Sequence, residues 1–233
     1  MLQYHFYADQ ARLDSTLAQL IADTITQAIA QRGQASIALS GGKTPTGMLQ
    51  RLRQYPLAWE KVLITLADER WVEETHRDSN ARFLQTTLLQ GPARAAIFLP
   101  LKNAALTPHE GQTQCEKVLA QLPNALDLIV LGMGDDGHTA SLFPHAPELN
   151  VAMHALTRSA AISPQTAPYL RMTLTAPYIA QSRHVILHIT GASKKQRLDS
   201  ALAADAPMPH LPIRTLLDLI QTKKQVFWTD EVF

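Results

Sequence analysis

Residues 36–47 read SIALSGGKTPTG, and this stretch decides the fold class. Its first four residues are a short, largely apolar run, as in a buried strand, and a glycine-rich turn follows them directly. We expect Thr44 and Pro45 to be the N-cap and first position of a helix that runs to Gln54. A strand that turns tightly into a helix is half of a βαβ unit, the repeating element of parallel sheets.

The same alternation continues along the chain. Further helices are expected at residues 9–32, 79–89, 108–121 and 193–203, with a short one ending at 181. Further strands are expected at residues 62–66, 96–99, 126–131, 171–174, 184–189 and 225–228. This order predicts an α/β protein with a mostly parallel sheet covered by helices on both faces. We expect a single domain over residues 1–233, in which the prolines at 207, 209 and 212 mark an internal loop.

Composition narrows the classes of function. The chain of 233 residues has 21 Lys and Arg against 20 Asp and Glu, a net charge of +1, so no basic surface for nucleic acid is expected. No apolar run approaches the roughly 20 residues of a membrane helix, and the first residues lack the pattern of a secretory signal. The single cysteine, Cys115, excludes an intrachain disulfide and is interpreted as a structural thiol on a helix. The cytoplasm is the expected location.

Unusual polar residues follow the predicted strands. In an open parallel sheet, ligands bind outside the carboxyl ends of the strands, so segments that are distant in sequence can meet at one edge. Four segments occupy such positions: Ser40–Lys43, Asp68–Arg70, Gly132–His138 and Gly191–Lys195. We therefore expect a single ligand site at this edge.

The first of these loops contains GKT, the end of a nucleotide-binding P-loop. A P-loop needs a glycine five residues before Gly42, where this chain has Ile37, so ATP binding is not expected. Two glycines before a helix still allow backbone N–H groups to point at an anion. The predicted cradle for a phosphate smaller than ATP comprises Ser40, Gly41, Gly42, Lys43 and Thr44. The alternative is a tight turn that binds nothing.

The segment 132–144, GMGDDGHTASLFP, carries the strongest signal for catalysis. His138 stands between a glycine and a small residue, so its ring can face a pocket. A histidine of ordinary pKa, about 6.5, accepts a proton at neutral pH, and a nearby carboxylate can orient it. The alternative reading of His138 is a capping or loop histidine.

Several cationic residues could bind an anion. Arg70 can grip a phosphate with two parallel hydrogen bonds, or form a surface ion pair with Glu69 or Glu73. Lys194 or Lys195 begins a helix, and Arg171 lies in a predicted strand, where it should face solvent, an edge or a ligand. No metal site is expected, because the other histidines lack metalloprotease spacing and one cysteine cannot form a thiolate cluster.

Five segments, LSGGKTP, LADERWV, GMGDDGHTASLFP, RMTLT and GASKKQRL, occur in this order and resemble the 6-phosphogluconolactonase family. The resemblance covers residues 8 to 230, and the segment around His138 is its most specific part. It implies a Rossmann-like three-layer fold with a small added lobe, similar to that of the glucosamine-6-phosphate deaminases. It also implies hydrolysis of 6-phosphogluconolactone, a small phosphosugar lactone, in the pentose phosphate pathway.

The resemblance assigns roles to residues. His138 would be the base that activates water, and Asp68 and Asp136 would support it. Arg70, Arg171 and Lys194 would bind the phosphate, with the loop of Ser40–Thr44 nearby. The reaction needs neither a metal nor another cofactor, since a lactone is an activated ester. The sequence leaves open whether the protein is a monomer or a small homo-oligomer.

Two other functions are alternatives to lactone hydrolysis. Deaminases of the related family carry a glutamate before the proline that corresponds to Pro144, and Phe143 occupies that position here. They also carry a tyrosine at the position of Arg70. A non-catalytic sugar-phosphate sensor would have no need to keep both His138 and Asp136.

Overall fold

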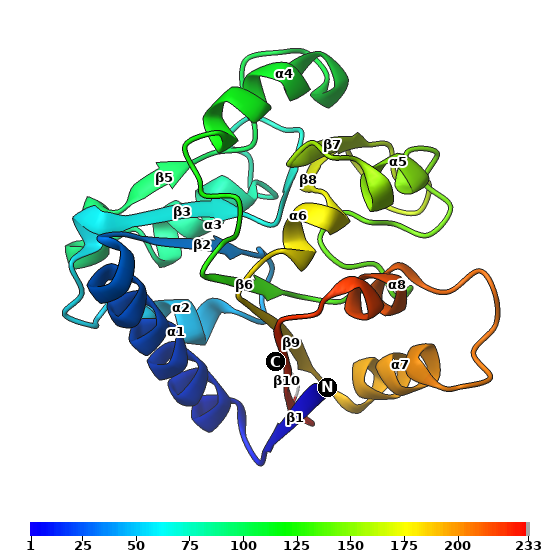
Figure 1. The fold of residues 1–233 in the computed structure, drawn as a ribbon, viewed down its shortest axis with the longest axis horizontal. Coiled ribbons are helices and arrows are strands. Elements are labelled where there is room, and N and C mark those ends of the chain that lie inside the picture. Colours follow the sequence, from blue (N-terminus) through cyan, green and yellow to red (C-terminus); the bar gives the residue numbers. More distant parts are fainter. Residues whose placement is uncertain (232–233) are drawn as a thin grey trace.

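The computed structural model describes residues 1–231 (Figure 1). The predicted domain of residues 1–233 ends with two residues that lie outside this range. Seven strands form one parallel sheet in the order β1-β10-β9-β6-β2-β3-β5. Their bounds are β1 Leu2–Tyr7, β2 Ala35–Leu39, β3 Val62–Leu66, β5 Ile97–Leu99, β6 Leu128–Leu131, β9 His184–Thr190 and β10 Lys223–Thr229. The α/β prediction with a parallel sheet is confirmed.

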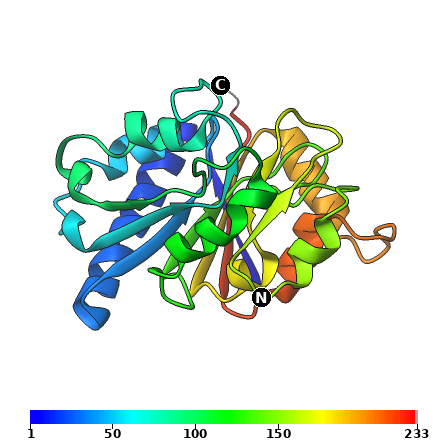
Figure 2. The same cartoon turned by 90° about the horizontal axis from the view of Figure 1, so that it is seen from above.

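Helices cover both faces of this sheet, as Figure 2 shows for α1 and for the helices of the C-terminal half. On one face lie α1 (Gln10–Arg32), α2 (Thr46–Leu52) and α3 (Asn80–Thr87), which connect strands that progress toward β5. After β5 the chain returns to the middle of the sheet and adds strands toward the other edge. Right-handed crossovers then place the later helices on the other face. These are α6 (Ala176–Ala180), α7 (Ala192–Leu202) and α8 (Pro212–Leu219). Short 3₁₀ helices span Trp59–Lys61 and Gly91–Ala95.

A second, smaller sheet forms the added lobe. It is antiparallel, in the order β4-β8-β7, with bounds β4 Asp68–Arg70, β7 Ser159–Ile162 and β8 Arg171–Leu174. Helix α4 (Pro108–Leu119) and helix α5 (Leu149–His154) pack on β7. The strand predicted around Arg171 therefore exists, but it belongs to the lobe and not to the main sheet.

Apolar packing explains the central strands. Every residue of β2, β3, β6 and β9 is buried, as expected for parallel strands covered on both faces. Cys115 lies in this core, and burial raises the pKa of its thiol to about 12, as befits a structural thiol. Within residues 1–231, no helix combines the length and apolarity that a membrane crossing requires.

The start of α2 differs from the prediction. The helix begins at Thr46, with Pro45 at the N-cap position and no capping side chain of its own, so Thr44 is not the cap. Asp14 of α1 is buried against this helix start, where a Cβ at Gly47 would lie 2.0 Å from its Oδ2. Thr44 instead faces the ligand edge of the sheet.

The direction in which successive strands are added to the sheet reverses between β2 and β6. Strands β3 and β5 continue from β2 on one side, whereas β9 and β10 continue from β6 on the other. Ser40 joins the two strands, since its backbone N–H and its hydroxyl both donate to the carbonyl of Val130, at 3.1 and 3.0 Å. A crevice is expected just beyond such a reversal.

Candidate active site

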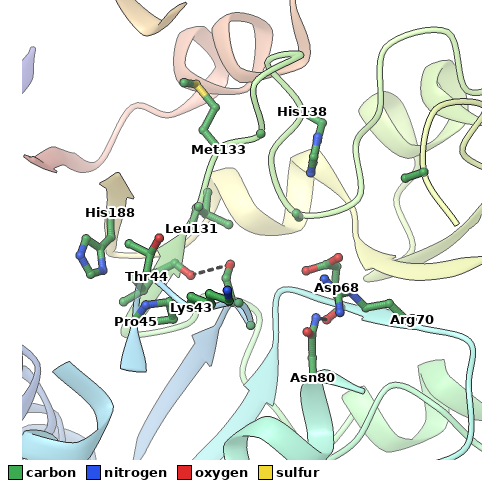
Figure 3. A pocket seen from close by; sticks show the side chains of 18 of the residues that line it. Lys43, Thr44, Pro45, Asp68, Arg70, Asn80, Leu131, Met133, His138 and His188 are labelled. Atoms are coloured by element: carbon green, nitrogen blue, oxygen red, sulfur yellow. Dashed lines mark hydrogen bonds between the residues drawn. The ribbon is translucent and has the colours of Figure 1, made fainter. Parts of the chain in front are cut away.

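A cavity of about 420 Å³ lies at this reversal point (Figure 3). Almost every residue predicted for the site lines it: Ser40, Gly41, Gly42, Lys43, Thr44, Asp68, Arg70, His138, Arg171 and Lys194. These residues come from β4 and β8 and from the segments that follow β2, β6 and β9. Asp136, the remaining predicted residue, does not line the cavity but contacts His138 directly.

His138 and Asp136 form a close pair. Nδ1 of His138 lies 2.5 Å from Oδ1 of Asp136, and the backbone N–H of His138 donates to the same oxygen at 3.1 Å. Burial alone would raise the pKa of Asp136, but the hydrogen bonds and charge of His138 outweigh it and the pKa is lowered. Since this carboxylate is ionised at neutral pH and only accepts hydrogen bonds, Nδ1 carries the shared proton, and Nε2 is the nitrogen left to act on a ligand.

Two neighbours fix the ring of His138. A Cβ atom at Gly134 would lie 2.2 Å from both Cε1 and Nδ1 of His138, so only glycine fits there. On the other face, the ring of Phe143 is stacked at a centroid distance of 4.1 Å. The GMGDDGH segment thus closes tightly around its histidine, and the backbone N–H of Gly134 donates to the carbonyl of His138 at 2.9 Å.

Asp68 is held by the neighbouring loop. It is 8% exposed, and the hydroxyl of Ser141 donates to its Oδ2 at 2.5 Å. The side-chain amide of Asn80 donates to the backbone carbonyl of Asp68 at 2.8 Å. Asp68 therefore presents a fixed carboxyl group to the cavity.

Arg70 and Arg171 are directly opposite each other on β4 and β8. Each guanidinium donates one hydrogen bond to a backbone carbonyl, at 2.6 Å to Asp78 and at 3.0 Å to Pro168. Both Nε atoms are buried and lack a partner among residues 1–231. Burial lowers the pKa of Arg171; the charge of Asp68 counteracts this and that of Arg70 adds to it. Two cations opposite each other suit an anionic ligand.

Glu69 does not form the surface ion pair considered as an alternative for Arg70. Its side chain is 1% exposed, and its carboxylate accepts hydrogen bonds from the backbone of Arg70, Asn80 and Ala81 at 2.7–2.8 Å. Burial raises its pKa, and these hydrogen bonds oppose that rise. Glu69 therefore anchors the start of α3 to β4, which leaves the Arg70 side chain available to the cavity.

The loop after β2 offers unpaired backbone donors. In the described chain, the N–H groups of Gly41, Gly42, Lys43 and Thr44 have no protein acceptor, and Gly42 has φ of +97°. Successive free N–H groups of this kind form an anion-binding concavity. Of the two lysines after β9, Lys194 lines the cavity, whereas Lys195 pairs with Asp199 at 2.6 Å.

Some lining residues were not predicted. Asn80 follows Asp68 by 12 residues and is brought back by the Glu69 anchor. His188 lies inside the apolar run of β9, and Phe143 was noted only as a family difference. Among residues 1–231, no three His, Cys, Asp or Glu side chains gather closely enough to hold a metal ion.

Known proteins are similar to this chain in sequence. The family model described as glucosamine-6-phosphate isomerases/6-phosphogluconolactonase matches residues 8–231. A 6-phosphogluconolactonase of Mesorhizobium japonicum is 39% identical over 227 residues, which is 97% of this chain and 94% of that protein. One from Pseudomonas aeruginosa is 40% identical, with 90% and 87% covered.

Solved structures are similar to this chain in fold. That of a 6-phosphogluconolactonase from Shewanella baltica superposes with a TM-score of 0.93 at 38% identity, covering 98% of each chain. A monomeric glucosamine-6-phosphate deaminase, at 18% identity and a TM-score of 0.78, shares the fold, with 97% of each chain covered. The fold and cavity thus define an α/β protein with a crevice, lined by cationic side chains, at its reversal point. The chain belongs to the family of glucosamine-6-phosphate isomerases and 6-phosphogluconolactonases.

Proposed function

We propose that this protein is a 6-phosphogluconolactonase, which hydrolyses 6-phosphogluconolactone to 6-phosphogluconate in the oxidative branch of the pentose phosphate pathway. The observation that carries the proposal is that His138, which is paired with Asp136, lines the same cavity as cations that suit a phosphate. The relatives from Mesorhizobium japonicum and Pseudomonas aeruginosa carry this name.

In this reaction, Nε2 of His138 takes a proton from water as the oxygen attacks the lactone carbonyl, and it gives the proton to the ring oxygen as the bond between that oxygen and C1 breaks. Asp136 holds the ring through Nδ1 and stabilises the imidazolium that forms. Asp68, fixed by Ser141, supports the same step from the cavity wall. General-base catalysis of this kind contributes roughly 10²–10⁴-fold.

The phosphate binds away from the reacting carbon. Arg70, Arg171 and Lys194 supply charge, and the loop of Ser40–Thr44 supplies N–H donors. Binding energy from this remote group holds the carbonyl in place for attack. The oxyanion is stabilised by a backbone N–H group or by one of the arginines.

The deaminase alternative is disfavoured by Phe143. This side chain stacks on His138, in the position where the deaminases carry a glutamate. We further propose a cytoplasmic enzyme, monomeric or a small homo-oligomer, with no cofactor and no nucleic-acid or membrane partner. Its one buried cysteine suits a reducing compartment.

The test is a lactonase assay on freshly prepared 6-phosphogluconolactone, corrected for spontaneous ring opening. We expect fast hydrolysis by the protein, without added metal. A parallel incubation with glucosamine 6-phosphate should release no ammonia. Ammonia release without lactone hydrolysis would reverse the assignment.

A further inference from the structure

His188 is a buried imidazole with no role in the reaction described above. It lies on β9 and is 3% exposed, and neither ring nitrogen has a hydrogen-bond partner among residues 1–231. An unpartnered buried polar group of this kind is destabilising and rare in native proteins. His184, on the same strand and face, is also buried, but its Nε2 lies 2.6 Å from the side chain of Gln225. The lack of a hydrogen-bond partner for His188 therefore indicates that a ligand supplies one.

The position of His188 shows which part of a ligand it can meet. The residue lines the cavity, and Figure 3 shows its side chain beside Thr44 and Pro45, on the far side of the cavity from His138. This is the part of the wall where the loop after β2 has its free N–H groups. Lys43 and Lys194 line the same cavity and suit an anion.

The chemistry of the ring determines which kind of hydrogen bond His188 can make to a ligand. Burial lowers the pKa of His188 to about 3, so the ring is neutral at physiological pH and has one N–H donor. A phosphate oxygen only accepts hydrogen bonds, and this N–H satisfies it without adding a charge beside the lysines. A half-turn of the ring about Cβ–Cγ exchanges its nitrogen and carbon positions, so either edge can present a nitrogen.

We propose that His188 binds the phosphate group of the substrate by donating a hydrogen bond from its neutral ring to a phosphate oxygen. This inference rests on the proposed function only in taking the ligand to be a sugar phosphate. It adds a residue from the middle of the sheet to the loop of Ser40–Thr44, at the part of the cavity that lies across from Arg70 (Figure 3).

The first test is His188→Leu, assayed on 6-phosphogluconolactone and on unphosphorylated glucono-1,5-lactone. A hydrogen bond to a charged group should be lost, so KM for the phosphorylated lactone should rise about tenfold while kcat stays within about twofold. The rate on the unphosphorylated lactone should not change. The Tm of the free enzyme should stay the same or rise, because an apolar side chain replaces an unpartnered polar one. His188→Gln, which keeps an N–H donor, should restore part of the affinity.

His184→Leu is the matched control. It removes a buried histidine from the same strand but leaves Oε1 of Gln225 without that hydrogen bond, so it should lower Tm and leave KM unchanged. An unchanged KM in His188→Leu would overturn the proposal. So would an equal loss on both lactones, which would assign the contact to a sugar hydroxyl.

A second measurement is independent of catalysis and of the folding of any variant. Wild-type protein labelled with ¹⁵N-histidine is titrated with inorganic phosphate and, separately, with 6-phosphogluconate. We expect one His188 ring N–H to shift downfield and exchange more slowly at saturation with either ligand. Saturation without a change at His188 would overturn the proposal, even if the protein proved not to be a lactonase.

Discussion

Arg70 and Arg171 are cross-strand partners in the small sheet of the lobe, with their side chains on the same face. Like charges directly opposite each other destabilise a strand pair, and here both Nε atoms are buried without a partner. A pair of this kind is best explained by an anion bound between or beside the two guanidinium groups. We therefore propose that the lobe takes part in phosphate binding.

Replacing either arginine by alanine should weaken substrate binding more than it slows turnover. We expect Arg70→Ala and Arg171→Ala each to raise KM by roughly 10–100-fold, the loss of one or two charge-assisted hydrogen bonds. Lys194→Ala should act in the same direction. Without phosphate, each arginine variant should lose little or no Tm, because a repulsion is removed. An unchanged KM in all three variants would show that these residues do not bind the phosphate.

His138→Asn should abolish most turnover and keep binding. We expect kcat to fall by roughly 10²–10⁴-fold, while the Tm rise caused by 6-phosphogluconate stays close to that of the wild type. Asp136→Asn should lower kcat less than this, because the ring keeps its place but loses its charged neighbour. Hydrolysis by His138→Asn at the wild-type rate would exclude His138 as the base.

Gly134→Ala tests whether the ring position matters. The added Cβ would lie 2.2 Å from the ring of His138 and 2.8 Å from Oδ1 of Asp136, so the pair must move. A displacement of about 1 Å can lower the rate by roughly 10²-fold. Gly132→Ala, where a Cβ meets no protein atom within 4 Å, is the control and should lose far less activity. Equal activities would show that the pair tolerates displacement.

Asp14 should make stability depend on pH below neutrality. Burial raises its pKa from 3.8 to about 6, against the hydrogen bond from Gln10. Between these values the folded state binds the proton more tightly than the unfolded state, so the contribution of Asp14 to stability falls as pH rises through this window. Asp14→Asn, which does not titrate, should therefore gain in Tm relative to the wild type by roughly 5–10 °C between pH 4 and pH 7. A constant difference in Tm across this range would contradict the assignment.

The sequence predicted the residues at the ends of the parallel strands well, for a physical reason. Buried strands are short apolar runs, so the polar residues that follow them, such as Ser40 and Asp68, stand out. The convergence of these segments on one cavity then follows from the sheet itself. The glycines around His138 also marked their segment as unusual, but the close contact between Gly134 and the ring was not predicted.

Residues placed by long-range contacts were missed. Asn80 enters the cavity only because the buried carboxylate of Glu69 holds its backbone, and Asp68–Arg70 forms a strand only by pairing with β8. The helix after Pro212 was not predicted, although proline is common at the first helical position. The edge strand β1 has a mixed polar and aromatic sequence and owes its structure to one neighbour.

That neighbour is β10, so the first strand of the chain pairs with the last one that the structure describes, from Leu2 beside Lys224 to Tyr7 beside Thr229. During synthesis on the ribosome, β1 must wait until nearly the whole chain has emerged before it can join the sheet. The pairing of β2 with β3 and β6 requires only the first 131 residues. Contacts this distant in sequence form slowly, so the edge of the sheet should be completed last, after the reversal point that shapes the cavity.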